Sequence, residues 1–178
     1  MNAMKKINSR NFFRYVFEFV VAGFIGWLYE VGITLVINHY FENRGILHLP
    51  IVPIYSVGAF ILLAMLREKK RSPVFIFLFA LVVTTLFELG SAYLLEFLFH
   101  KQFWTYHSWY FSILDRSSLI SSAIFGVLAV AYFYVLHPLS GKLSEKLPKP
   151  VCVGAGLTIS AVIITDFVIS VYQLLKDR

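Results

Sequence analysis

The sequence contains little cysteine and little charge. Cys152 is the single cysteine among 178 residues, which excludes an internal disulfide and any metal or iron–sulfur site built from several cysteines. Charged residues make up 15% of the chain, where about 25% is usual in soluble domains, and apolar residues make up 58%. The apolar residues form long runs with polar residues gathered between them, so we predict a membrane protein and not a soluble one.

Motifs for nucleotides, cofactors and hydrolytic catalysis are also missing from the sequence. It contains no G-x-x-x-x-G-K-[ST], G-x-G-x-x-G, G-x-S-x-G or H-E-x-x-H pattern. Four histidines of the predicted outer loops, His39, His48, His100 and His107, lack the H-x-x-x-H spacing of helical metal ligands. We therefore expect no cofactor and no metal site, and we expect any ATPase that powers the protein to be a separate partner.

Five apolar segments are long enough, or nearly long enough, to cross a membrane. A helix needs roughly 20 residues to span a hydrocarbon core of about 30 Å. The segments are 11–37, 52–66, 74–99, 118–136 and 151–175. We therefore predict an all-α fold, a polytopic transmembrane bundle that forms a single integral membrane domain over residues 1–178. The second segment is the shortest, and Pro50 and Pro53 suit the start of a helix.

Lysine and arginine are concentrated on one side of the predicted spans. Ten lie in the N-terminal tail and the second and fourth connections, and five lie on the other side. The ten are Lys5, Lys6, Arg10, Arg67, Lys69, Lys70, Arg71, Lys142, Lys146 and Lys149, and the five are Arg44, Lys101, Arg116, Lys176 and Arg178. Because an excess of lysine and arginine marks the cytoplasmic face, we predict a multi-pass cell-membrane protein with its N-terminus inside. The basic residues form no single face, so we expect no nucleic-acid partner.

Polar and small residues form stripes along four of the predicted spans. The stripes are Glu18, Ala22, Gly26, Glu30 and Thr34; Thr84, Glu88, Ser91, Ala92 and Glu96; Ser118, Ser122, Gly126 and Ala129; and Asp166, Ser170 and Gln173. A spacing of four places residues on one helix face. A carboxyl group that faced lipid would be unfavourable by about 2.5–3.5 kcal/mol on insertion scales, so we expect these stripes to face protein.

The acidic residues deepest in the predicted spans fall in their outer halves. At 1.5 Å per residue, Glu30, Glu88 and Asp166 lie roughly 20–30 Å from the cytoplasmic ends of their helices. Arg44 and Arg116 follow in the outer connections. We therefore predict a polar cavity that opens to the extracytoplasmic side, and a salt bridge of Glu30 or Glu88 with one of these arginines is the structural alternative.

Two further acids lie nearer the predicted membrane interfaces. We interpret Glu18 and Glu96 as structural residues, because water or a partner charge can satisfy them there. The outer connections, 38–49 and 100–117, are rich in aromatic residues and histidine. Such segments suit headgroup depth.

The order and spacing of several short motifs resemble a known family. The motifs are Gly26-Trp27-Leu28-Tyr29-Glu30, Asn43-Arg44-Gly45, Pro50, Pro53-Ile54-Tyr55, Gly58, Phe87-Glu88, Trp104 with Tyr106, and Arg116. Over about residues 12–138 the chain resembles the ABC-transporter permease family of the CmpB type, which consists of small bacterial polytopic membrane proteins. The family pattern has Asn-x-x-Gly-Arg before the fourth span, where this chain has Leu114-Asp115-Arg116. The resemblance implies a role in transport.

Several residues of the family motifs are also the polar residues expected in the outer halves of the spans and in the outer connections. The candidate ligand-binding residues are Glu30, Arg44, Tyr55, Glu88, Trp104, Tyr106, Arg116 and Asp166. Acids and guanidinium groups at one level favour a small polar or zwitterionic ligand or a lipid headgroup. We therefore predict a permease-type or solute-binding membrane subunit that contacts lipid.

Partners and other functions stay open at this point. The segment 137–150 could form a short amphipathic helix around Leu139, Leu143 and Leu147 that docks an ATPase or membrane partner, and a chain this small could form a homo-oligomer. One alternative function is an intramembrane enzyme for a lipid-linked substrate, with Glu30 and Glu88 as acid and base. The other is a structural subunit that clasps a membrane protein through its small-residue faces.

Overall fold

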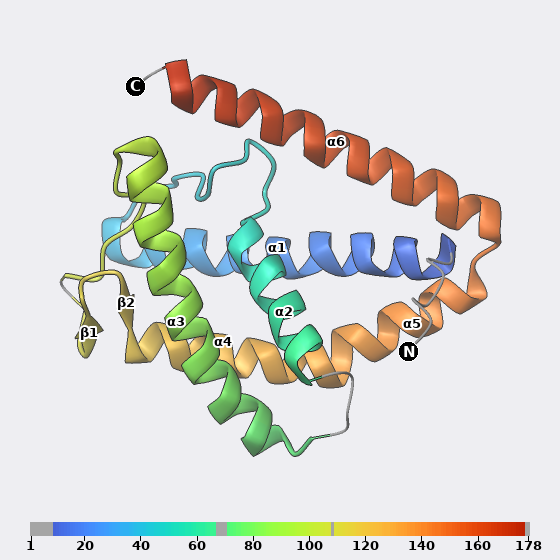
Figure 1. The fold of residues 1–178 in the computed structure, drawn as a ribbon, viewed down its shortest axis with the longest axis horizontal. Coiled ribbons are helices and arrows are strands. Elements are labelled where there is room, and N and C mark those ends of the chain that lie inside the picture. Colours follow the sequence, from blue (N-terminus) through green and yellow to red (C-terminus); the bar gives the residue numbers. More distant parts are fainter. Residues whose placement is uncertain (1–8, 67–70, 108, 177–178) are drawn as a thin grey trace, which may run out of the picture. The chain divides into compact units, whose positions relative to one another are not determined.

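The structure, a computed structural model, is mostly helical (Figure 1), as predicted. It describes residues 9–66, 71–107 and 109–176. The helices are α1 (Ser9–Asn38), α2 (Pro53–Leu66), α3 (Pro73–Phe99), α4 (Leu119–Ala131), α5 (His137–Lys146) and α6 (Lys149–Lys176), with a π-helical turn, η1 (Tyr132–Leu136), between α4 and α5. The strands found in the described residues are β1 (Ser112–Ile113) and β2 (Ser117–Ser118), which pair antiparallel.

Within residues 9–66, 71–107 and 109–176, four helical segments have the length and composition to cross a membrane. They are Ser9–Val36, Pro73–Phe99, Leu119–Lys146 and Lys149–Lys176. The second predicted span corresponds to α2, a shorter apolar helix of 14 residues. Large apolar side chains such as Leu86, Phe97 and Val127 are exposed, as expected where lipid is the solvent. Among the basic residues behind the predicted orientation, Lys5, Lys6, Arg67, Lys69, Lys70 and Arg178 lie outside the described residues.

The chain divides into two compact units, which we describe one at a time. The first comprises the described residues of 1–56 and 135–171, and the second those of 57–134 and 172–178.

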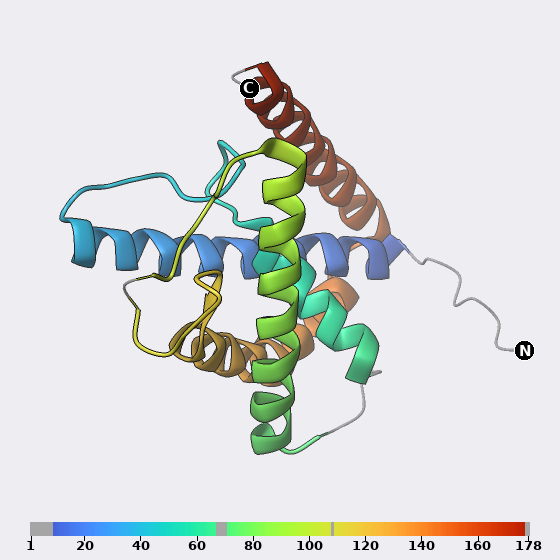
Figure 2. The same ribbon diagram turned by 60° about the vertical axis from the view of Figure 1, so that its left-hand side comes forward.

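In the first unit, the connection after α1 turns back along the helix (Figure 2). The N–H of Val52 donates to the carbonyl oxygen of Gly23 at 3.0 Å, and Leu47, Ile51 and Val52 are buried. α2 therefore starts at a level 15 residues before the end of α1, about 22 Å back along the helix. This return explains why α2 is short. The connection has already run back along part of the length of α1 before α2 begins.

Gly26 allows Tyr55, in the first turn of α2, to approach α1 closely in this unit. A Cβ atom at Gly26 would clash with the ring of Tyr55. The buried positions of the predicted α1 stripe include Glu18, Gly26 and Thr34, so this face of α1 packs against protein as predicted.

In the second unit, α3 packs against α4 through stripes of small and polar residues. The buried residues of α3 recur at every fourth position, and they are Ile76, Ala80, Thr84, Glu88 and Ala92. The facing residues of α4 are Ser121, Ser122, Gly126 and Ala129. An apolar core is formed by Leu62, Leu66, Ile76, Ala80 and Ala129. The predicted stripes therefore mark the contact faces of these two helices.

The helix that begins at Leu119 continues past the predicted end of its span at residue 136. It passes through η1 into α5 and ends at Lys146. Pro138 accounts for the irregular turn, because proline has no N–H to donate and its ring clashes with the carbonyl group four residues earlier. A π-helical turn relieves that clash without breaking the helix.

We predict that Gly126→Ala lowers the melting temperature of the purified protein by several degrees. The new methyl group would lie 2.8 Å from the ring of Phe77 and 3.1 Å from its carbonyl oxygen. Overpacking of this kind costs about 1–3 kcal/mol. The matched control is Gly90→Ala on α3, where a Cβ atom would meet nothing within 4 Å. Equal melting temperatures for the two variants would contradict the close packing.

Candidate functional site

Acidic side chains of the apolar helices dominate the polar contacts of the structure. Five of them, Glu18, Glu30, Glu88, Glu96 and Asp166, accept hydrogen bonds or ion pairs from a connection or from another helix.

Glu30 forms an open charged group in the first unit. The hydroxyl of Tyr55 donates to Glu30 Oε1 at 2.7 Å, and Arg44 Nε lies 3.8 Å from Glu30 Oε2. The side chains of Glu30 and Arg44 are 26% and 28% exposed. Arg44 also contacts Glu42 at 3.2 Å. The structure thus brings together three predicted site residues in a loose, partly solvated ion pair.

Asp166 ties α6 to the returning connection in the same unit. Its Oδ1 lies 2.9 Å from His48 Nδ1, and its Oδ2 accepts the backbone N–H of Leu49 at 3.0 Å. The hydroxyl of Ser170 also lies 2.9 Å from His48 Nδ1. Because the acid and the hydroxyl meet the same ring nitrogen, the three residues do not form the relay of a catalytic triad.

Glu88 lies in a closed polar pocket of the second unit. The hydroxyl of Tyr106 donates to Oε1 at 2.7 Å and that of Ser117 donates to Oε2 at 2.7 Å. Ser121 approaches Oε1 at 3.4 Å. Glu88 is 4% exposed and the two serines are fully buried.

Arg116 pairs with Glu96, not with Glu88. Arg116 Nε lies 2.6 Å from Glu96 Oε1, and its backbone carbonyl accepts the indole N–H of Trp104 at 3.0 Å. The hydrogen bond to Glu96 raises the pKa of the Arg116 guanidinium above its ordinary value, so it stays charged. Asp115 adopts a left-handed φ of 56°, the region that favours glycine.

The eight predicted site residues therefore form four local groups. Glu30, Arg44 and Tyr55 form one, and Asp166 with His48 forms the second, both in the first unit. Glu88 with Tyr106, and Trp104 with Arg116, lie in the second unit. Each of these acids has hydrogen-bond donors within its own unit, and the pairing of Glu30 with Glu88 as acid and base stays a prediction.

A fifth group, around Glu18, was not predicted. Glu18 is fully buried. Its carboxylate accepts Arg14 Nε at 2.9 Å, contacts His137 Nδ1 at 3.0 Å and accepts the hydroxyl of Ser140. Of the two partners that the sequence left open for Glu18, water or a protein charge, the structure shows the protein charge.

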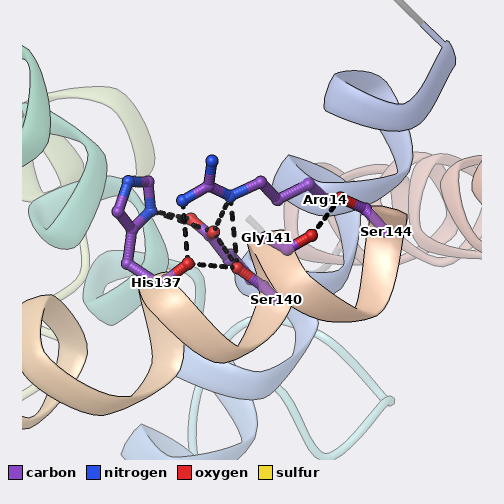
Figure 3. A network of polar contacts seen from close by, with 6 residues as sticks. Arg14, His137, Ser140, Gly141 and Ser144 are labelled. Atoms are coloured by element: carbon purple, nitrogen blue, oxygen red, sulfur yellow. Dashed lines mark hydrogen bonds and ion pairs between the residues drawn. The ribbon is translucent and has the colours of Figure 1, made fainter. Parts of the chain in front are cut away.

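Figure 3 shows the residues of α5 that face Arg14, among them His137, Ser140 and Gly141. Arg14 Nη2 donates to the carbonyl oxygen of His137 at 2.8 Å, and a Cβ atom at Gly141 would lie 3.4 Å from the guanidinium carbon. Ser140 and Ser144 are buried against α1, so α5 turns its small polar side inward. Arg14 and Glu18 are four residues apart and visible as a helical pair, but His137 lies 119 residues further on, and no local spacing could reveal it.

Within the described part of the chain, no three histidine, cysteine, aspartate or glutamate side chains gather closely enough to hold a metal ion.

Comparison with known proteins identifies one family. The family described as "Putative ABC-transporter type IV" matches residues 17–171. No curated protein and no solved structure matches the chain. The matched range contains every predicted site residue and also Glu18 and His137.

We predict that Glu18→Gln lowers the free energy of unfolding by about 3 kcal/mol, because it leaves Arg14 and His137 without their buried carboxylate. The measurement is reversible denaturation of the purified protein in mixed micelles. Glu145→Gln is the matched control, since Glu145 is exposed on α5. A Glu18→Gln protein as stable as the control would show that the buried group contributes nothing to stability.

Proposed function

Because the chain belongs to the family described as "Putative ABC-transporter type IV", we propose that it is a permease-type or solute-binding membrane subunit of a transporter. The membrane part of this proposal draws support from four long apolar helices. The sequence has no P-loop, so the ATPase of such a transporter would be a separate chain.

We propose that Glu30 and Arg44 bind the ligand, a small zwitterion or a lipid headgroup. The observation that carries this proposal is the loose ion pair of 3.8 Å between two side chains that are both about one-quarter exposed. A ligand ammonium group would bind the Glu30 carboxylate, and a ligand carboxylate or phosphate would bind the Arg44 guanidinium. Because the ion pair between Glu30 and Arg44 is weak, breaking it on ligand binding would cost little free energy.

Tyr55 acts as a positioning residue in this proposal. It is buried between Gly26 and the ring of Tyr29, and its hydroxyl holds one oxygen of Glu30. That leaves the second oxygen, Oε2, on the side of Arg44. Asp166 has a supporting role in this proposal, because it holds the connection that carries Arg44. The remaining predicted residues lie in the second unit and take no part in this proposal; they are Glu88, Trp104, Tyr106 and Arg116.

The structural-subunit alternative draws less support from the contacts. It requires small-residue faces that are open to another protein. Gly26 and Gly126 instead lie against Tyr55 and Phe77 of this same chain.

We expect Glu30→Gln and Arg44→Gln each to abolish ligand-dependent thermal stabilisation. The assay compares melting temperatures of the purified protein with amino acids, betaines and soluble phosphocholine and phosphoethanolamine headgroups. A ligand at 100 times its Kd stabilises by about 2.7 kcal/mol, which is readily measured.

Glu42→Gln is the matched control, because Glu42 contacts Arg44 but is more exposed. It should keep the stabilisation. If a compound stabilises the wild type and both Glu30→Gln and Arg44→Gln equally, the ligand binds elsewhere and this assignment is wrong.

We propose that α5 forms the surface for a partner subunit on the cytoplasmic side. Its buried face consists of Ser140 and Ser144, whereas Leu139 and Leu143 are exposed and Lys142 lies beside them. α5 buries its serines against its own chain and leaves its leucines exposed. Such exposed leucines favour an apolar contact with another protein.

The proposed orientation predicts opposite labelling of two cysteine variants in intact cells. Tyr110→Cys, at a position 82% exposed, should react with a membrane-impermeant maleimide added outside. Leu143→Cys should react only after the membrane is permeabilised. Cys152 is fully buried and provides a silent background. The reverse pattern would place α5 outside and overturn both the orientation and the partner surface.

A further inference from the structure

The pocket around Glu88 differs from the other acidic groups in the kind of donors it contains. Hydroxyl groups from three different segments surround the carboxyl group: Tyr106 from the connection after α3, Ser117 from β2 and Ser121 from α4. Ser118 caps the N-terminus of α4 by accepting the N–H of Ser121 at 3.0 Å. This cap fixes the start of α4, the helix that carries Ser121.

The hydroxyl groups can satisfy Glu88 in either protonation state. With Glu88 ionised, the Tyr106 hydroxyl donates to Oε1 and the Ser117 hydroxyl donates to Oε2. With a proton on Oε1, Glu88 donates to the Tyr106 oxygen, and the Tyr106 hydroxyl turns to Ser121 Oγ, which lies 2.9 Å away. Either atom of that last pair can be the donor, since hydroxyl groups both donate and accept.

Among the described residues, the charged side chains near this part of α3 lie on the connections and not on the neighbouring helices. Neither α4 nor residues 57–66 of α2 contain an ionisable side chain. Tyr106, whose hydroxyl donates to Glu88, is itself titratable. Arg116 is paired with Glu96, which lies eight residues, about 12 Å, further along α3. On the flanking connections, His107 is paired with Asp115 in an exposed position, and His100 and Lys101 are exposed.

We infer that Glu88 is a proton-binding site, whose carboxyl group takes up and releases a proton while the hydroxyl groups of Tyr106, Ser117 and Ser121 keep it hydrogen-bonded. Uptake forms an O–H bond at Oε1 and reverses the direction of the Tyr106 hydrogen bond. The proton comes from water and returns to it, and no other group changes its charge. This function goes beyond the proposed ligand site, because it involves other residues and a different ligand.

The test is infrared difference spectroscopy of the full-length protein in lipid vesicles during a pH titration. We expect the carbonyl-stretch band of a protonated carboxyl group to appear on acidification, and we expect Glu88→Gln to remove it. Tyr106→Phe keeps the carboxyl group but deletes its partner, so the band should persist at a higher frequency. Glu30→Gln and Glu145→Gln are the controls and should leave the Glu88 band in place.

Two results would overturn the inference. One is a titrating band that is unchanged in Glu88→Gln, and the other is a Glu88 carboxyl group that stays in one protonation state throughout the titration. If Glu88→Gln does not fold, Tyr106→Phe decides the question, because a band of unshifted frequency would place the titrating group elsewhere. The ligand assay on Glu30 and Arg44 is independent, so failure of either proposal leaves the other standing.

Discussion

The structure depends on the rule that a carboxyl group removed from water must find donors within the protein. Each acid in the apolar helices meets this rule by binding a segment far away in the sequence: Glu18 holds α5, Glu30 and Asp166 hold the returning connection, and Glu88 and Glu96 hold the segment before α4. The acids therefore shape the irregular parts of the chain. The acidic residues proposed for ligand or proton binding therefore also hold the connections in place.

Irregular backbone is tolerated in this protein where side chains satisfy it. The π-helical turn precedes Pro138, and the carbonyl oxygen of His137 beside it accepts a hydrogen bond from Arg14. The returning connection is held by the carbonyl of Gly23 and by Asp166. In hydrocarbon, non-helical backbone survives only with such partners. We therefore propose different functions for two of these groups, a polar ligand for the open ion pair of Glu30 and Arg44 and a proton for the hydroxyl-lined Glu88.

Residues whose role depends on helical periodicity were predictable. The stripes on α1, α3 and α4 correctly identified buried faces, because a spacing of four is a property of the helix itself. The position of Glu18 along its span does not reveal that α5 packs against it, because His137 and Ser140 are distant in the sequence. Arg116 was expected near the deeper acids, but the hairpin of β1 and β2 places it beside Glu96. Distance along the sequence carries no information on either contact.

The sequence by itself determined that this is an all-α membrane protein of a transport-related family, because apolar length, helical period and motif order are local properties. It also determined which faces of α1, α3 and α4 are buried in the protein. Only the tertiary structure decided which donor each acid receives: Tyr55 and Arg44 for Glu30, hydroxyl groups for Glu88, and His137 and Ser140 for Glu18. The physical reason is that these partners lie up to 122 residues apart and are brought together by the path of the connections.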